Sequence, residues 1–417
     1  MAYMIGLNSG TSFDGIDAVL VDITTGEDGH PNPPEFIDGL SMQWPEEVQD
    51  VMLQTFANKI DMEGLGRLNY VAGAVFANVA NALLKKTGVS PKDVLGIAVD
   101  GQTIYQEQPD HRKINQLTEE EKGDLVARWF KGPYPICYQL VESNVVAAHT
   151  NITTITHFRQ ADHAFGGNGA PLMQYLDWVV FKDKAPALTL NLGGIANVQL
   201  VYKDRRDMVA FDTGPGNVLL DHACRNLYGI QYDKGGEIAA KGQVNDEMLA
   251  ELMKHPYFER ELPRSAWRND FSSTYGDTIL AKFSHLSGED IMATFCAFTA
   301  EAISKNAKDN IPNFKDIKVM IASGGGVLNP TLMKHIQDRL PEGVRLTTSD
   351  EFGVPPLFKE AIKFATIGYS TLNQVANNIP AASHADNYAI MGKVAFAPRH
   401  AKGVGELPEK NKQKETV

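Results

Sequence analysis

The feature that most constrains the fold is a hairpin-like pattern that occurs twice in the same order. Residues 3–23, YMIGLNSGTSFDGIDAVLVDI, form an apolar run, a turn of small and hydroxyl residues, and a second apolar run. Residues 187–204, ALTLNLGGIANVQLVYKD, repeat this layout around a turn of asparagine and glycine. Two apolar runs separated by such turn residues predict two strands joined by a tight turn.

Each hairpin pattern is followed by the same second unit. Residues 70–86 and 288–306 have the apolar spacing of amphipathic helices. Each helix is followed by a segment that begins with charged residues, continues as a short apolar run and ends in glycine, at 92–101 and 315–326. Short apolar runs of this kind are typical of buried parallel strands. Two echoes in one order favour a duplicated α/β architecture, with one glycine-rich hairpin from each half facing a cleft.

The chain length supports this division. At 417 residues the chain exceeds one ordinary domain, so two domains are the default expectation. We predict units at 1–185 and 186–378, with the boundary in the stretch DWVVFKDKAPA. The charged segment 110–131 is expected to be a solvent-exposed helical insertion. Residues 379–417 lose apolar periodicity and are expected to be a partly disordered tail.

Composition narrows the class of protein. Hydrophobic content of 43% and charged content of 22% describe a soluble globular chain. A formal net charge of -12 argues against nucleic acid or an anionic membrane as the main partner. The three cysteines are too widely spaced for a disulfide framework or a zinc site. We see no signal peptide and no apolar run long enough to span a membrane, so a cytoplasmic location is expected.

The first turn carries an unusual concentration of polar groups. The sequence contains no P-loop, dinucleotide fingerprint, serine nucleophile elbow or H-E-x-x-H motif. Instead, the hydroxyl groups of Ser9, Thr11 and Ser12 lie beside the carboxylates of Asp14 and Asp17. A simple hairpin needs only the Asp-Gly pair, whereas this set can cradle a phosphate and its metal ion. We therefore expect a phosphate site at this turn.

Two glycine-rich stretches follow strands of the second half. FDTGPGN, residues 211–217, places Asp212 at a strand end, where a carboxylate can act as a base or contact a metal. SGGGVLNP, residues 323–330, precedes a helix and can bring the backbone close to a flat ligand or a phosphate. Each also has a purely structural interpretation, an Asx turn in the first case and a tight strand-to-helix turn in the second.

Three further stretches carry polar groups that suit a sugar. HFRQADHAFGGNGAPL contains Arg159 and Asp162, which can grip a hydroxyl group or simply pair with each other. DGQTIYQ, residues 100–106, puts amide and hydroxyl groups at a strand end. FKEAIKFATIGYS places Glu360 on an expected helix, where spacing alone describes a solvated side chain.

As a set, these motifs resemble the anhydro-N-acetylmuramic acid kinases and the similar fungal levoglucosan kinases. The resemblance rests on SGTSFDGID, DGQTI, FRQADHAFGGNGAPL, NLGGIANV, FDTGPGN, SGGGVLN and KEAIKFA, which occur in family order along nearly the whole chain. It implies an α/β fold of the actin/hexokinase-like (ribonuclease H-like) type, duplicated into two domains around an interdomain ATP cleft. It also implies ATP and Mg²⁺ as cofactors and a 1,6-anhydro sugar as the small-molecule substrate.

The reaction implied by the resemblance opens the 1,6-anhydro ring with water and phosphorylates O6. Asp212 would contact the sugar and take the proton from water, while Glu360 and Asp14 would organise Mg²⁺ and the O6 region. The groups that would cradle the phosphates are Ser9, Gly10, Thr11, Ser12, Asn191, Gly193 and Gly194. Those that would face the nucleoside are Gly324, Gly325, Gly326 and Asn329. Those that would read the sugar are Thr103, Arg159 and Asp162.

Some residues depart from the family pattern. The stretch LPRSAWRND, residues 262–270, stands where the family usually has P-P-K-[ST]-[ST]-G-R-E. Asp100 stands where histidine is common, and Asn168 where glutamine is usual. The choice between anhydro-N-acetylmuramic acid and levoglucosan therefore stays open. Family members are often dimers, so the resemblance also allows a homodimer.

Two alternatives stay open beside this reading. One is a conventional hexose or polyol kinase of the same fold, which would phosphorylate a sugar without opening an anhydro ring. The other is a non-catalytic nucleotide-binding protein of the actin-like type. Turnover of a 1,6-anhydro sugar with ATP distinguishes an anhydro-sugar kinase from the first alternative. The presence of acids at Asp14, Asp212 and Glu360 argues against the second.

Overall fold

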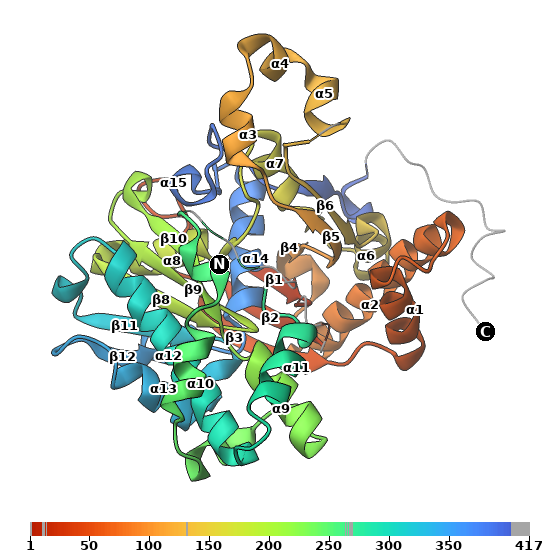
Figure 1. Cartoon of the computed structure of the whole chain (residues 1–417). Coiled ribbons are helices and arrows are strands. Elements are labelled where there is room, and N and C mark those ends of the chain that lie inside the picture. Colours follow the sequence, from red (N-terminus) through yellow and green to blue (C-terminus); the bar gives the residue numbers. More distant parts are fainter. Residues whose placement is uncertain are drawn as a thin grey trace.

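Two sheets with one common strand order form the framework of the molecule (Figure 1). The computed structural model describes residues 2–10, 13, 15–130, 132–262, 264, 266 and 270–401. The first sheet runs in the order β13 (Lys393–Ala395), β7 (Thr154–Thr156), β4 (Val94–Val99), β1 (Tyr3–Asn8), β2 (Ile16–Asp22), β3 (Glu35–Met42). The second runs in the order β10 (Val209–Pro215), β9 (Ile195–Val201), β8 (Ala187–Leu192), β11 (Val319–Ser323), β12 (Arg345–Thr348).

Strand directions repeat as well. In the first sheet β1, β2 and β3 are antiparallel neighbours, and β4 and β7 join parallel to β1. In the second sheet β8, β9 and β10 are antiparallel, and β11 and β12 join parallel to β8. This ribonuclease H-like topology is present twice in one chain. The duplicated actin/hexokinase-like fold predicted from the sequence is thereby confirmed.

Helices cover the outer faces of both sheets. The first half contributes α1 (Glu46–Phe56), α2 (Met62–Thr87) and α6 (Ser143–Thr150). The second half contributes α9 (Val218–Tyr228), α10 (Asp246–Leu252), α11 (Ser273–Lys282), α12 (Gly288–Asn310) and α13 (Pro330–Gln337). The helices expected at 70–86 and 288–306 are thus α2 and α12. Asp61 caps the start of α2 by accepting a hydrogen bond from the Gly64 N–H, and Gly88 ends it in the left-handed conformation.

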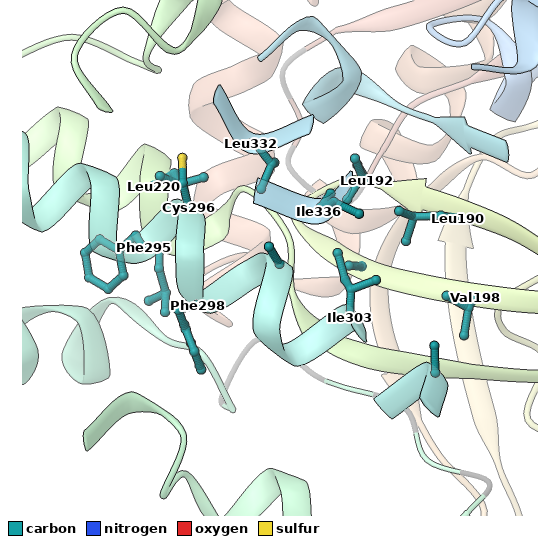
Figure 2. Close-up of a cluster of buried hydrophobic side chains, with 14 of the residues drawn as sticks. Leu190, Leu192, Val198, Leu220, Phe295, Cys296, Phe298, Ile303, Leu332 and Ile336 are labelled. Atoms are coloured by element: carbon teal, nitrogen blue, oxygen red, sulfur yellow. The ribbon is translucent and has the colours of Figure 1, made fainter. Parts of the chain in front are cut away.

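The core of the second half lies between its sheet and α12. Figure 2 shows Phe295, Phe298 and Ile303 on one side of this core and Leu190 and Val198 of the sheet close by. All six residues of β8 are buried. A strand covered on both faces reads as a continuous apolar run, which is why ALTLNL lacks the alternation of a half-exposed strand.

Two helices join the halves. α8 (Met173–Phe181) comes from the first half but packs against β9, and α14 (Lys359–Leu372) comes from the second half but packs against β1 and β4. α8 and α14 also contact each other, and one hydrophobic cluster contains residues from both helices and both sheets. All but one of the α14 residues from Lys359 to Thr371 are buried. This central position puts the start of α14 where both halves meet.

The remaining elements are smaller. β5 (Gln102–Glu107) and β6 (Ile136–Leu140) form a two-stranded antiparallel sheet. The charged excursion contains α3 (His111–Gln116), α4 (Glu119–Gly123) and α5 (Leu125–Phe130), which project at the top of Figure 1. α7 (Arg159–Ala164) follows β7. No helix among the described residues is long and apolar enough to cross a lipid bilayer.

The segment expected to be a partly disordered tail contributes to the fold as far as it is described. α15 (Pro380–Ser383) follows α14, and β13 pairs antiparallel with β7 at the edge of the first sheet. The described part of this segment is therefore ordered, because sheet pairing supplies order that apolar spacing does not reveal. Residues 402–417 lie outside the described part. The division at residues 185/186 and 378/379 stays a prediction. α8 and α14 each pack against the other half.

The contact between α14 and β1 depends on a missing side chain. A Cβ atom at Gly6 would lie 2.0 Å from the carbonyl oxygen of Ala361. Gly6→Ala is therefore expected to push α14 away and lower the free energy of unfolding by about 1–3 kcal/mol, measured by urea denaturation. The exposed helical Gly66, around which a Cβ would meet no atom within 4 Å, supplies the control. Gly66→Ala is expected to be neutral or stabilising, and equal behaviour of the two variants would contradict this packing.

Candidate active site

A cavity of about 240 Å³ is lined by residues from both halves of the chain. It gathers side chains that are up to about 350 positions apart in the sequence, as predicted for a cleft between duplicated units. The predicted site residues that line it are Ser9, Gly10, Thr103, Arg159, Asn191, Asp212 and Glu360. Thr11, Ser12 and Asp14 lie outside the described residues, as do Trp267 and Asn269 of the divergent LPRSAWRND stretch.

Strand register explains how the second half brings its polar groups to this cavity. Asn191 on β8 is opposite Asn197 on β9, and Asn197 is opposite Asp212 on β10. Residues directly opposite in antiparallel strands project to the same face of the sheet. All three side chains line the cavity. The sheet therefore presents a row of two amides and one carboxylate to any bound molecule.

Asp212 lies in surroundings that suit a general base. Burial raises the pKa of Asp212 to about 7, although the Ala266 N–H and the Arg264 guanidinium favour its charged form. The Ala266 N–H donates to Asp212 Oδ2 at 2.7 Å, and the Tyr257 hydroxyl donates to the Asp212 backbone carbonyl at 2.8 Å. These contacts fix the carboxylate in place. A base with a pKa near the working pH is ionised in a large share of molecules and still accepts a proton readily.

Glu360 lies in the first turn of α14, at the junction of the two halves. The Asn191 Nδ2 group donates to Glu360 Oε1 at 3.5 Å. This contact links the second sheet to a helix that otherwise packs on the first sheet. Sequence spacing predicted a solvated side chain for Glu360. Because α14 lies between the two halves, this side chain faces the cavity instead.

Arg159 reaches the cavity from the start of α7. Its Nε donates to Asp100 Oδ2 at 2.6 Å, and its Nη1 donates to the Gly169 carbonyl at 2.8 Å. Asp100 also accepts from the Phe158 N–H at 3.2 Å. The acid that stands where the family commonly has histidine is thus the partner of Arg159. The pairing holds the guanidinium in one orientation and leaves other N–H groups for a ligand.

Asp162 does not line the cavity, so the expectation that it reads the sugar directly is corrected. Its side chain is wholly buried and accepts hydrogen bonds from the Gly169 N–H at 2.9 Å, Asn378 Nδ2 at 3.0 Å and Ser383 Oγ at 2.8 Å. These bonds join the glycine-rich loop after α7 to the segment around α15. Because Arg159 donates to the same Gly169 residue, Asp162 positions the loop that holds Arg159.

The glycine turns of the second half pack against one another outside the cavity lining. Gly324 has φ of +87°, and a Cβ there would lie 2.7 Å from the Leu192 carbonyl oxygen. Asn329 caps α13 by accepting from the Leu332 N–H at 2.9 Å. The predicted nucleotide contacts of Gly193, Gly194, Gly324, Gly325, Gly326 and Asn329 stay predictions. The observed geometry gives Gly324 and Asn329 structural roles as well.

Asn197 and Lys363 are two of the cavity residues that sequence reasoning missed. Asn197 lies within the NLGGIANV motif but had no assigned role, and Lys363 lies one turn after Glu360. Only 5% of Lys363 is exposed, and burial lowers the pKa of its ammonium group while Glu360 opposes that effect. The signal that could have found Asn197 is its register opposite Asp212. No sequence pattern separates Lys363 from a lysine on a solvated helix face.

The residues present fit a magnesium ion held jointly with a ligand. Among the described residues, no three His, Cys, Asp or Glu side chains gather into a metal site. Mg²⁺ in phosphoryl transfer is usually bound by one or two carboxylates, with water and phosphate oxygens completing its shell. Glu360 offers such a carboxylate at the cavity.

The cavity of acids, amides and hydroxyls where the halves of this duplicated fold meet suits an ATP-dependent carbohydrate kinase, and the family match shows that class. The family model described as anhydro-N-acetylmuramic acid kinase matches residues 2–122 and 120–397. The kinase of that name from Clostridioides difficile is 34% identical over 400 residues, covering 95% of this chain and 99% of its own. That from Francisella tularensis subsp. novicida is 35% identical over 398 residues, covering 94% and 98%. The chain belongs to the anhydro-N-acetylmuramic acid kinase family.

Proposed function

We propose that this chain opens a 1,6-anhydro sugar with water and phosphorylates the released O6 at the expense of ATP. The substrate is anhydro-N-acetylmuramic acid or levoglucosan. The observation that carries the proposal is the single cavity that brings Asp212 and Glu360 together with Ser9, Thr103 and Arg159. Membership of the kinase family supports it, since the relatives bear the name of the first of these substrates.

Asp212 is the base of the proposed reaction. It removes a proton from water, and the water oxygen forms a bond to C1 as the C1–O6 bond breaks. The electron pair left on O6 forms a bond to the γ-phosphorus of ATP as the bond to ADP breaks. The proton ends on Asp212, and the products are the sugar 6-phosphate and ADP. General base catalysis of this kind contributes about 10²–10⁴-fold to a rate.

The other side chains bind and orient. Ser9, Gly10, Thr11, Ser12, Asn191, Gly193 and Gly194 cradle the phosphates, and Gly324, Gly325, Gly326 and Asn329 face the nucleoside. Glu360 and Asp14 hold Mg²⁺, which when bound neutralises charge on the phosphates. Phosphoryl transfer depends mainly on such positioning and charge neutralisation.

The sugar is read from the first half. Thr103 offers a hydroxyl to the cavity, and Arg159 offers the guanidinium N–H groups that Asp100 and Gly169 do not take. Lys363 of α14, which belongs to the second half, adds a buried ammonium group to the same cavity. A conventional hexose kinase could use the same cavity, with Asp212 taking the proton from a free O6 hydroxyl. Burial raises the pKa of the Asp212 carboxylate to about 7, which suits a base and therefore favours catalysis over binding alone.

One assay separates these functions. Release of ADP and formation of 6-phosphate are measured with Mg²⁺ and ATP on anhydro-N-acetylmuramic acid, levoglucosan and glucose. The proposal expects one ADP and one 6-phosphate for each molecule of an anhydro sugar consumed. Turnover of glucose alone would instead establish the conventional kinase, and no turnover of any sugar would favour the non-catalytic alternative.

A further inference from the structure

Asn197 occupies the central place in the row of side chains at the cavity. Its neighbours opposite are Asn191 on one side and Asp212 on the other. Directly opposite residues in antiparallel strands have Cβ atoms about 4.5–5.5 Å apart, so the Asn197 amide lies next to the proposed base. Asn197 is 8% exposed and lines the cavity. Nothing described so far gives this amide a role.

A buried chain of polar groups holds the Asn197 amide. Gln199 Nε2 lies 2.6 Å from Asn197 Oδ1, and Thr189 Oγ1 lies 2.7 Å from Gln199 Oε1. Thr189 Oγ1 also lies 2.5 Å from Asp177 Oδ2, and Asp177 pairs with Lys359 at 2.6 Å. Thr189, Gln199 and Asp177 are wholly buried. This series of hydrogen bonds therefore starts at the Asp177–Lys359 ion pair and ends at Asn197 in the cavity.

The hydrogens in this chain decide which end of the Asn197 amide faces the cavity. A threonine hydroxyl has one hydrogen, and an ionised carboxylate only accepts, so this hydrogen goes to Asp177. The Gln199 amide must then donate to Thr189, so both amides are turned over relative to the atom positions given above. Gln199 Nε2 then faces Thr189, and Gln199 Oε1 faces Asn197. The two ends of a side-chain amide are alike in shape and are assigned by such bonding. Asn197 consequently donates to Gln199 and turns its carbonyl oxygen to the cavity.

We propose that Asn197 is a further catalytic residue, whose side-chain carbonyl accepts one hydrogen of the attacking water while Asp212 accepts the other. The inference rests on the proposed function. A water that donates to both acceptors turns its two lone pairs away from them, and one of these lone pairs points toward C1. As the oxygen bonds to C1 and the C1–O6 bond breaks, the hydrogen at Asp212 is transferred. The hydrogen at Asn197 stays on the oxygen and becomes that of the new C1 hydroxyl.

The direct test removes the amide. Asn197→Leu keeps the size of the side chain but cannot accept a hydrogen bond, and we expect kcat to fall about 100-fold. The KM for ATP is expected to stay unchanged, because the amide is assigned to the water. The acid limb of the kcat/KM profile is expected to keep the parent's midpoint, since Asp212 keeps its own contacts. A variant damaged around Asp212 would move that midpoint.

A second variant tests the chain rather than the amide itself. Thr189→Val has nearly the same shape and releases Gln199, so Asn197 loses its fixed orientation, and we expect a loss in kcat on the order of tenfold. Thr366→Val is the matched control. Thr366 is also wholly buried, but its hydroxyl bonds only to the Ile362 carbonyl of its own helix. The control is expected to keep the parent kcat.

The outcomes distinguish this inference from the function on which it rests. A parent enzyme that consumes no anhydro sugar would overturn both. An active parent whose Asn197→Leu variant keeps full kcat would overturn the role of Asn197 alone. Equal kcat values for Thr189→Val and Thr366→Val would overturn the orienting chain. Thermal melting of each variant, measured with and without ATP, identifies any variant that fails to fold. If Asn197→Leu fails to fold, Asn197→Ala is used for the same comparison.

Discussion

Asp212→Asn is expected to abolish phosphorylation of the anhydro sugar while leaving ATP binding intact. Asparagine has the shape of aspartate and can still accept the Ala266 N–H, so the backbone around it stays in place. It cannot take a proton from water, and we expect kcat to fall by about 10²–10⁴-fold or more. Steady-state kinetics and calorimetric titration with ATP measure the two effects separately.

A buried aspartate away from the cavity provides the control for this substitution. Asp233 is also buried, and its carboxylate accepts the N–H groups of Ile238 and Ala239, each at 3.0 Å. It does not line the cavity. Asp233→Asn is therefore expected to keep kcat. Near-normal turnover in Asp212→Asn would remove Asp212 from its proposed role.

The same substitution is expected to stabilise the fold at alkaline pH. The pKa of Asp212 rises from 3.8 to about 7 on folding because the carboxylate is buried. Its contribution to stability is present below the unfolded pKa and is lost as pH rises through the folded pKa. Asparagine avoids this loss. The free energy of unfolding of Asp212→Asn should therefore exceed that of the parent by on the order of a few kcal/mol at pH 8, and by less at pH 5. Urea denaturation at both pH values measures the difference.

Loss of Lys359 is expected to cause the largest change in stability. Lys359 Nζ and Asp177 Oδ1 lie 2.6 Å apart, and 1% and 0% of these side chains are exposed. The contact lacks the alignment of a hydrogen bond, so the attraction is that of an ion pair. Lys359→Met leaves the Asp177 carboxylate buried without its counter-charge, which typically costs about 3–5 kcal/mol of the free energy of unfolding.

A double variant and a surface pair make this result specific. Lys359→Met combined with Asp177→Asn removes both charges, so most of the lost stability should return. Lys334→Met breaks the exposed pair that Lys334 of α13 forms with Asp338, and it is expected to change the free energy of unfolding by less than about 1 kcal/mol. If Lys359→Met were no more destabilising than Lys334→Met, the buried pair would not hold α14 against α8.

The sequence carried much of the architecture because the fold repeats a local pattern. Each half needs its own hairpin with a small-residue turn and its own helix leading to a buried strand, and both copies were visible. Asp212 and Asn191 could be predicted for the same reason, since each stands in or beside a glycine-rich turn at a strand end. These are places where the chain must change direction, and their residue types are restricted.

The residues that were missed or misplaced depend on packing between distant segments. α14 is covered by both halves, so Lys363 is buried although its spacing resembles that of a surface lysine. Asn197 was hidden in the alternation of a strand and becomes notable only through its register with Asp212. Asp162 was expected to read the sugar together with Arg159, but the segment around α15 folds back and buries it. Such contacts between distant segments have no local sequence signal.

The central claim is that water adds to C1 of the sugar in the same turnover that phosphorylates O6. The most direct measurement is turnover in H₂¹⁸O with ATP, with the product reduced at once by borohydride so that its C1 oxygen no longer exchanges. Mass spectrometry is expected to find one ¹⁸O at C1 of the sugar 6-phosphate and none in its phosphate group. Product without ¹⁸O at C1, or ¹⁸O released in inorganic phosphate instead, would contradict the account.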